Sequence, residues 1–160
     1  MNSSNHHNNK KETPSDKKKR KKSHKHSSMY NNPIDSMINK ILKTNSHIFY
    51  NRLMVSFWDN SNDKETLRSM VERVYMSSSI ICNRSSLTAI KLLTLLHRLF
   101  LQTPQEFMKA SIVELKFYNQ LIEFWKIDSS QDFMKDLVIS YAKFMIARLK
   151  FHSKNPIFES

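Results

Sequence analysis

The chain has 160 residues, with 26 Lys or Arg against 14 Asp or Glu, which gives a formal net charge of +12 at pH 7. It contains no glycine and a single cysteine, so glycine-rich phosphate loops and internal disulfide bonds are excluded. Tight β-hairpins usually need Asn-Gly or Asp-Gly pairs, so their absence makes an all-α protein the expected class. The cysteine usage and the lack of a charged-then-apolar leader favour a cytoplasmic location.

The basic excess is concentrated at the amino-terminal end. Residues 1–30 hold nine Lys or Arg against one Glu and one Asp, a net charge of +7, and they include almost no apolar side chains. Such a segment cannot bury enough apolar surface to offset its chain entropy. We therefore predict a disordered tail over residues 1–30 and one folded domain over residues 31–160.

Six consecutive basic residues in this tail are candidates for non-specific contact with anionic surfaces. Three interpretations remain open: a solvated arm, a nuclear-import or nucleic-acid patch, and attraction to anionic lipid, which is worth roughly 1 kcal/mol per Lys or Arg. The four tail histidines are scattered, so no metal site is expected. The basic run consists of Lys17, Lys18, Lys19, Arg20, Lys21 and Lys22.

Apolar residues recur at helical spacing from residue 34 onward. The pair Asn32-Pro33 is typical of a helix start, and the pattern predicts a helix that ends near Thr44. A second helix is expected at about residues 47–59. Asn62 and Glu65 have capping-box spacing, so they mark the expected start of a third helix. The side chains expected to face inward from the second helix are Phe49, Leu53, Met54, Phe57 and Trp58, with Val55 beside them.

The stretch Ser85–Gln102 is apolar around almost its whole circumference. Such a helix cannot lie on a surface, so we predict that it is the central rod of a helical bundle. Ser85 or Ser86 can cap its start, and Pro104 ends it. Its charged residues interrupt it too often for a bilayer span. The polar residues that recur at steps of three and four are Thr88, Lys91, Thr94, Arg98 and Gln102.

Three more helical segments follow the rod. We expect a short turn of helix at residues 104–110, a helix at about 111–126, and a last helix that runs to about His152. Six or seven helices with short connections predict an up-and-down stack of antiparallel neighbours. The side chains expected inward are Val113, Phe117, Leu121, Phe124 and Trp125 in the first long helix, and Phe133, Leu137, Val138, Tyr141, Phe144, Met145, Leu149 and Phe151 in the last.

The sequence has no arrangement typical of a catalytic centre, so a non-enzymatic protein without a cofactor is expected. Cys82 follows two isoleucines, which favours a buried, unreactive side chain over a nucleophile. His97 lies in the rod, where a hydrogen-bonded core histidine is more common than a base. The glutamates between residues 106 and 123 lie on separate turns and form no convergent pair.

The corner between the first two helices is the best candidate for a specific site. Lys40 and Lys43 lie at the end of one helix, and His47 and Arg52 lie near the start of the next. All four can converge on a phosphate, with the free N–H groups of the second helix beside it. The alternative is that the two lysines only offset the dipole of the first helix.

Three blocks of the sequence resemble the ANTH/ENTH family. SSLTAIKLLTLLHRLFLQTPQEFM is similar to the signature helix of that family, and ISYAKFMIARLKFHSKNPIFES is similar to a late ANTH segment. FHSKNPIF is most similar to the huntingtin-interacting branch, and ILKTNSH resembles the family's first corner. The blocks occur in the family's order over residues 33–159.

The resemblance implies a right-handed superhelical stack of helices that binds phosphoinositides at the cytoplasmic side of the plasma membrane or of clathrin-coated vesicles. It also implies clathrin, adaptor or actin-linked coat proteins as partners in endocytosis and vesicle trafficking. Lys43 and His47 match the corner lysine and histidine of the family, whereas the lysine-rich cluster that usually follows is replaced by Arg52 alone. The headgroup site is therefore expected to be shortened, and the domain at residues 31–160 is shorter than the family's usual length.

Two other functions remain open. A nuclear or nucleic-acid-binding protein would act through the basic tail, and a helical protein-interaction scaffold would have lost the lipid site. Two explanations of the length also remain open, a small stand-alone form and part of a longer chain.

Overall fold

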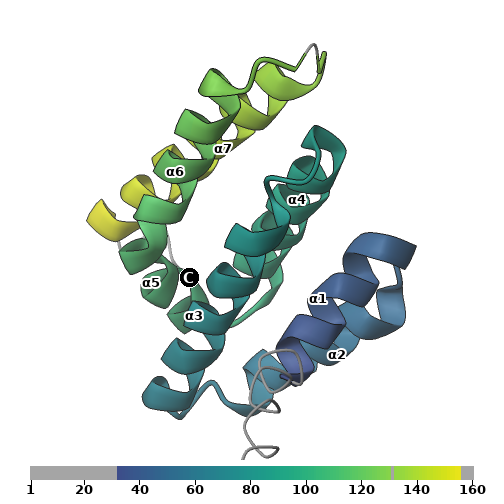
Figure 1. The fold of residues 1–160 in the computed structure, drawn as a ribbon. Coiled ribbons are helices and arrows are strands. Elements are labelled where there is room, and N and C mark those ends of the chain that lie inside the picture. Colours follow the sequence, from purple (N-terminus) through teal and green to yellow (C-terminus); the bar gives the residue numbers. More distant parts are fainter. Residues whose placement is uncertain (1–31, 131, 156–160) are drawn as a thin grey trace, which may run out of the picture. The chain divides into compact units, whose positions relative to one another are not determined.

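The computed structural model describes residues 32–130 and 132–155, so the basic run and the rest of the predicted tail lie outside the described residues. These residues form helices and connections and contain no strand, which confirms the all-α prediction. The elements, shown in Figure 1, are α1 (Pro33–Thr44), α2 (His47–Asp59), α3 (Lys64–Ile81), α4 (Ser86–Gln102), α5 (Gln105–Ser111), the 3-10 turn η3 (Ile112–Glu114), α6 (Leu115–Ile127) and α7 (Lys135–Lys154).

The helix starts follow from side-chain caps. Asn32 Oδ1 accepts a hydrogen bond from the N–H of Ile34 at 2.9 Å, and Ser85 Oγ accepts one from Thr88 at 3.2 Å, which confirms both predicted starts. The predicted start of the third helix at Asn62 is wrong by one residue. Asp63 is the cap, because its carboxylate accepts hydrogen bonds from the N–H groups of both Glu65 and Thr66 at 3.1 Å.

The predicted rod, α4, is the centre of the packed core. It contacts α1, α3, α5 and α7, and Leu92, Leu93, Leu96 and Leu99 are completely buried. It ends at Gln102, two residues before Pro104, as predicted. The central position of the rod is therefore confirmed, while α2 packs mainly on α1 and α6 packs mainly on α7.

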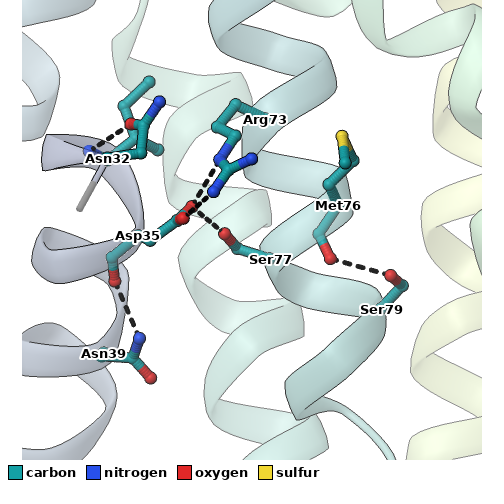
Figure 2. Close-up of polar contacts among 8 residues, drawn as sticks. Asn32, Asp35, Asn39, Arg73, Met76, Ser77 and Ser79 are labelled. Carbon is teal, nitrogen blue, oxygen red and sulfur yellow. Dashed lines mark hydrogen bonds and ion pairs between the residues drawn. The ribbon is translucent and has the colours of Figure 1, made fainter. Parts of the chain in front are cut away.

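An ion pair in the core connects α1 to α3. Figure 2 shows Asp35 of α1 reaching Arg73 and Ser77 of α3. Arg73 Nε donates to Asp35 Oδ1 at 2.9 Å, while its Nη2 and the Ser77 hydroxyl also contact the carboxylate. Asp35 is buried, and a buried carboxylate needs such partners. This contact fixes the orientation of α1, and with it the corner that α1 shares with α2.

The boundaries between the rod and α6 differ from the prediction. The helix expected at 111–126 begins only at Leu115, because α5 runs on to Ser111 and the turn η3 follows it.

Several side chains that were expected to face inward are exposed instead. The segments that contain them carry more apolar residues than their buried sides can hold. These side chains are Val55, Trp58, Val113, Phe124, Phe133, Leu137, Phe144 and Phe151.

Candidate functional site

The helices α1 and α2 meet at a connection of only two residues. α1 ends at Thr44, and Asn45 takes the left-handed conformation with a φ of 50°. Its N–H donates to the carbonyl of Ile41 at 2.9 Å. Because asparagine tolerates this conformation better than most residues, the chain can reverse at once, and α2 begins at His47. The tight corner predicted from the sequence is confirmed.

The four residues predicted to bind an anion occupy three different places around this corner. Lys40 Nζ lies 4.6 Å from the ring centroid of Phe49, and Arg52 Cζ lies 5.9 Å from the same centroid, so these two cations meet on one aromatic ring. Lys43 is exposed in the last turn of α1, where it also complements the negative end of the helix dipole. His47 is exposed at the start of α2 and faces a pocket.

This pocket has a volume of about 360 Å³ and lies between the corner and α4. Its basic groups are His47 from α2 and Lys91 and Arg98 from α4. Aliphatic side chains supply much of the remaining wall, so the cations are concentrated against a partly apolar surface. The other lining residues are Ile41, Leu42, Asn45, Ser46, Tyr50, Ile90, Thr94 and Leu95. The basic groups of this pocket favour an anion such as a phosphate group.

Arg98 is positioned by an aromatic ring. Its Cζ lies 3.8 Å from the ring centroid of Tyr50, and the buried Tyr50 hydroxyl donates to Gln102 Oε1 at 2.6 Å. Burial raises the pKa of Tyr50, although the neighbouring Arg98 acts in the opposite direction, so the hydroxyl remains a donor at neutral pH. The guanidinium lies over the ring and also interacts with the Tyr50 hydroxyl, and because arginine has five N–H donors, others can serve an anion.

Lys91 links α4 to the end of α1. Its Nζ donates to the carbonyl of Leu42 at 3.5 Å, one of the last carbonyls of α1, which have no partner within the helix. Among residues 32–130 and 132–155, no ion pair joins Lys91 or Arg98 to a carboxylate. Within the part of the chain that the structure describes, the pocket therefore contains cations without counter-charges, which favours a positive potential.

The amino-terminal end of α2 adds to this potential. Ser46 occupies the cap position, but its side chain makes no capping hydrogen bond. The first N–H groups of α2 therefore lack a side-chain acceptor from the cap, and the positive end of the helix dipole lies beside His47. Both features favour an anion at the rim of the pocket.

Lys91 and Arg98 were not among the residues predicted to bind an anion. They were recognised only as members of the polar stripe of the rod, together with Thr94, which also lines the pocket. Polar residues on one side of an otherwise buried helix must face either solvent or a binding site. The polar stripe could therefore have indicated Lys91 and Arg98. Lys40 and Arg52 were predicted to bind the anion because they lie close to the corner in the sequence, but both side chains lie against the ring of Phe49.

The other candidate side chains are explained by packing. Cys82 is buried as predicted, and burial raises the pKa of its thiol to about 11, so the thiol is protonated at neutral pH. His97 is hydrogen-bonded as predicted: Arg148 Nη1 donates to His97 Nε2 at 2.8 Å, and His97 Nδ1 lies 3.0 Å from the Tyr141 hydroxyl. Burial and the charge of Arg148 lower the pKa of His97.

Among the residues that the structure describes, no group of three or more His, Cys, Asp or Glu side chains could hold a metal ion. None of the helices that these residues form combines the length and the apolar character that crossing a bilayer requires.

Comparison with known proteins gives one match. The family model of the ANTH domain matches residues 51–160, a range that begins inside α2 and includes Arg52, Lys91 and Arg98. The residues Lys40, Lys43 and His47 lie upstream of this range. No curated protein and no solved structure matches the chain. Because the family model covers more than half of the sequence, the chain belongs to the ANTH domain family.

Proposed function

We propose that this chain is a phosphoinositide-binding adaptor module in clathrin-mediated endocytosis, and that His47, Lys91 and Arg98 hold the headgroup phosphates. At the level of the family, ANTH domains are non-catalytic, cytoplasmic, membrane-peripheral adaptors that bind phosphoinositide-containing membranes. For this chain we propose the plasma membrane or clathrin-coated vesicles as the location. Its proposed partners are clathrin, adaptor or actin-linked coat proteins.

The observation that supports the headgroup site most directly is the pair of cations from α4 that have no carboxylate partner among the described residues and face the start of α2 in one pocket. Hydrogen bonds between charged partners contribute about 1.5–3 kcal/mol each, more than neutral ones. An inositol ring with several phosphates can engage Lys91, Arg98 and the α2 terminus together. A lipid with a single negative charge can engage only one of these groups at a time, so the pocket should prefer the polyanionic headgroup.

The predicted residues Lys40, Lys43 and Arg52 act around this pocket in the proposal. Lys43 is exposed in the last turn of α1 and adds positive charge near the corner. Lys40 and Arg52 share the ring of Phe49, and they strengthen the attraction of the corner to a negatively charged membrane. Their contribution is sensitive to salt, because exposed charges are screened within about 8–10 Å at physiological ionic strength.

The test compares two kinds of phosphatidylcholine vesicle with the same total negative charge. In one the charge is supplied by phosphatidylinositol 4,5-bisphosphate, and in the other by phosphatidylserine. Arg98→Ala should weaken binding to the phosphoinositide vesicles by roughly tenfold, which corresponds to about 1.4 kcal/mol, and binding to phosphatidylserine by less than about twofold. Lys143→Ala removes an exposed charge on α7 and is the matched control. Equal losses on both vesicles for Arg98→Ala would contradict a specific headgroup site.

Deletion of residues 1–30 separates this function from its alternatives. A headgroup preference that survives the deletion supports the adaptor module. If all binding to anionic surfaces disappears with the tail, the chain acts on polyanions, including nucleic acid, through its basic run. If the shortened protein folds but has no headgroup preference, it is a protein-interaction scaffold.

A further inference from the structure

The helix α2 has apolar side chains on two opposite sides. Tyr50, Leu53 and Phe57 are buried in the core, as an amphipathic helix requires. On the other side, Ile48 is 66% exposed and Val55 is 55% exposed. Single exposed apolar side chains are common on proteins, and Ile127 and Phe133 of this chain are more exposed, so exposure alone does not mark a site. The charged and aromatic groups around this side of α2 must therefore indicate what it contacts.

The exposed residues form one continuous face. Ile48, Arg52 and Val55 follow each other at steps of four and three, so they lie on one side of α2. We call these three residues the outer face of α2. The face is hollowed by a depression of about 490 Å³, which is also lined by Asn51, Ser56, Asp59 and Asn60.

Basic side chains lie near the amino-terminal half of this face, whereas Asp59, the last residue of α2, lines the same depression at the other end. His47, which lines the anion pocket, immediately precedes Ile48. Arg52 lies within the face, and Lys40 approaches the same Phe49 ring as Arg52. Apolar side chains with Lys and Arg beside them are typical of surfaces that lie in the headgroup region of an anionic bilayer.

A tryptophan lies beside the outer face. Trp58 is 55% exposed, and its Nε1 donates to the carbonyl of Gln102 at 3.0 Å, so the indole is held in place against the end of α4. Tryptophan is enriched at membrane interfaces because its ring is apolar while its N–H is polar. The aliphatic pair, Arg52 and the tryptophan thus share one helix, and together with Lys40 of α1 they fit one occupant, a lipid surface.

We infer that the outer face of α2 is a membrane-contact surface and that Ile48 and Val55 enter the interfacial region of the bilayer, about 5–10 Å deep, when the pocket holds a headgroup. The inference rests on the proposed function, because the headgroup brings α2 to the membrane. The apolar contact then contributes affinity that a soluble headgroup cannot provide. Vesicle binding and binding of a soluble inositol phosphate should therefore respond differently to changes in this face.

The experiment uses the full chain, so that the tail contributes equally to every variant. Vesicle binding is measured with phosphatidylcholine vesicles that contain phosphatidylinositol 4,5-bisphosphate, and pocket binding is measured calorimetrically with inositol 1,4,5-trisphosphate. Ile48→Ser and Val55→Ser should each weaken vesicle binding by roughly tenfold and leave trisphosphate binding unchanged within twofold. Leu137→Ser, at a position on α7 that is 51% exposed, is the matched control and should change neither.

The depth of insertion into the bilayer is measured from the fluorescence of the two tryptophans of the chain. Vesicles whose phosphatidylcholine is brominated on the acyl chains should quench Trp58, whereas Trp125 is only 3% exposed and should remain unquenched. The quenching should disappear in Trp58→Phe and decrease in the Ile48→Ser/Val55→Ser double variant.

The possible results separate this inference from the proposed function. Vesicle binding that needs the phosphoinositide but gives no quenching overturns membrane insertion and leaves the headgroup site intact. Quenching without any trisphosphate binding supports the membrane-contact face and contradicts the headgroup site. If the double variant binds vesicles like the unchanged protein, or if it changes the sedimentation coefficient of the chain in the absence of vesicles, the face packs against protein and the inference is wrong.

Discussion

Replacement of Tyr50 can separate the positioning of Arg98 from the stability of the fold. The Tyr50 ring lies 3.8 Å from Arg98 Cζ, measured at the ring centroid, and its hydroxyl is 2.6 Å from Gln102 Oε1. Tyr50→Phe keeps the ring and removes the hydroxyl. Tyr50→Leu removes the aromatic face as well. The two variants therefore test two different contacts of the same side chain.

The contacts predict different magnitudes for the two variants. Loss of the hydrogen bond should lower the free energy of unfolding by about 0.5–1.5 kcal/mol in Tyr50→Phe. Tyr50→Leu also loses the cation–π contact, worth about 0.5–2 kcal/mol, and leaves a partial cavity, so a total loss of about 2–4 kcal/mol is expected. An unsupported Arg98 must be ordered when the ligand binds, which costs about 1 kcal/mol and should weaken inositol phosphate binding by roughly fivefold.

Urea denaturation gives the stability of both variants, and calorimetry with inositol 1,4,5-trisphosphate gives their affinity. The expected pattern is a near-normal affinity for Tyr50→Phe and a weakened affinity for Tyr50→Leu. If the phenylalanine variant loses as much affinity as the leucine variant, or if the leucine variant binds normally, the ring does not position Arg98 for the ligand. The assignment of Arg98 to the headgroup would then lose its structural basis.

Leu93→Asp should prevent cooperative folding, because Leu93 is completely buried in α4 and an unpaired charge there costs several kcal/mol; a melting curve close to that of the unchanged protein would contradict the central rod. Asp35→Ala should lower the melting temperature by roughly 10 °C, and Asp35→Leu combined with Arg73→Met should recover much of that loss in the same scan. The lowered pKa of His97 means that the unfolded chain binds more protons than the folded one below pH about 6.5, so stability should fall from pH 7 to pH 5. Denaturation curves of His97→Gln should lose this slope, and an unchanged slope would assign it to other groups.

The elements that could be predicted are those whose starts or burial depend on residues close to one another in the sequence. The starts of α1 and α4 follow from Asn32 and Ser85, whose side chains cap N–H groups two or three residues away. The central position of α4 follows from its composition, because a helix that is apolar nearly all round must be surrounded. Even the error at α3 was local, since Asp63 competes with Asn62 for the same cap and its carboxylate reaches two N–H groups.

The elements that could not be predicted depend on contacts between distant parts of the chain. Trp58 has the spacing of an inward residue, but it lies at the edge of α2 against Gln102, and only the position of α4 decides this. The pocket shows the same limitation. Lys91 and Arg98 reach the corner because α4 packs beside it, and the sequence around Lys43 contains no sign of that neighbour.

The contacts that hold α1 and α2 on the rest of the fold also build the candidate site. Lys91 binds the end of α1, Tyr50 binds Gln102 while it supports Arg98, and Asp35 connects α1 to α3. Bringing two cations of α4 close to the positive end of α2 places like charges together, which is unfavourable in the absence of an anion. An anion in the pocket removes this repulsion and stabilises the packed arrangement, because a ligand that binds only the folded state adds its binding free energy to stability. If the pocket holds the proposed headgroup, its binding is therefore coupled to the packing of the first two helices through the same few side chains.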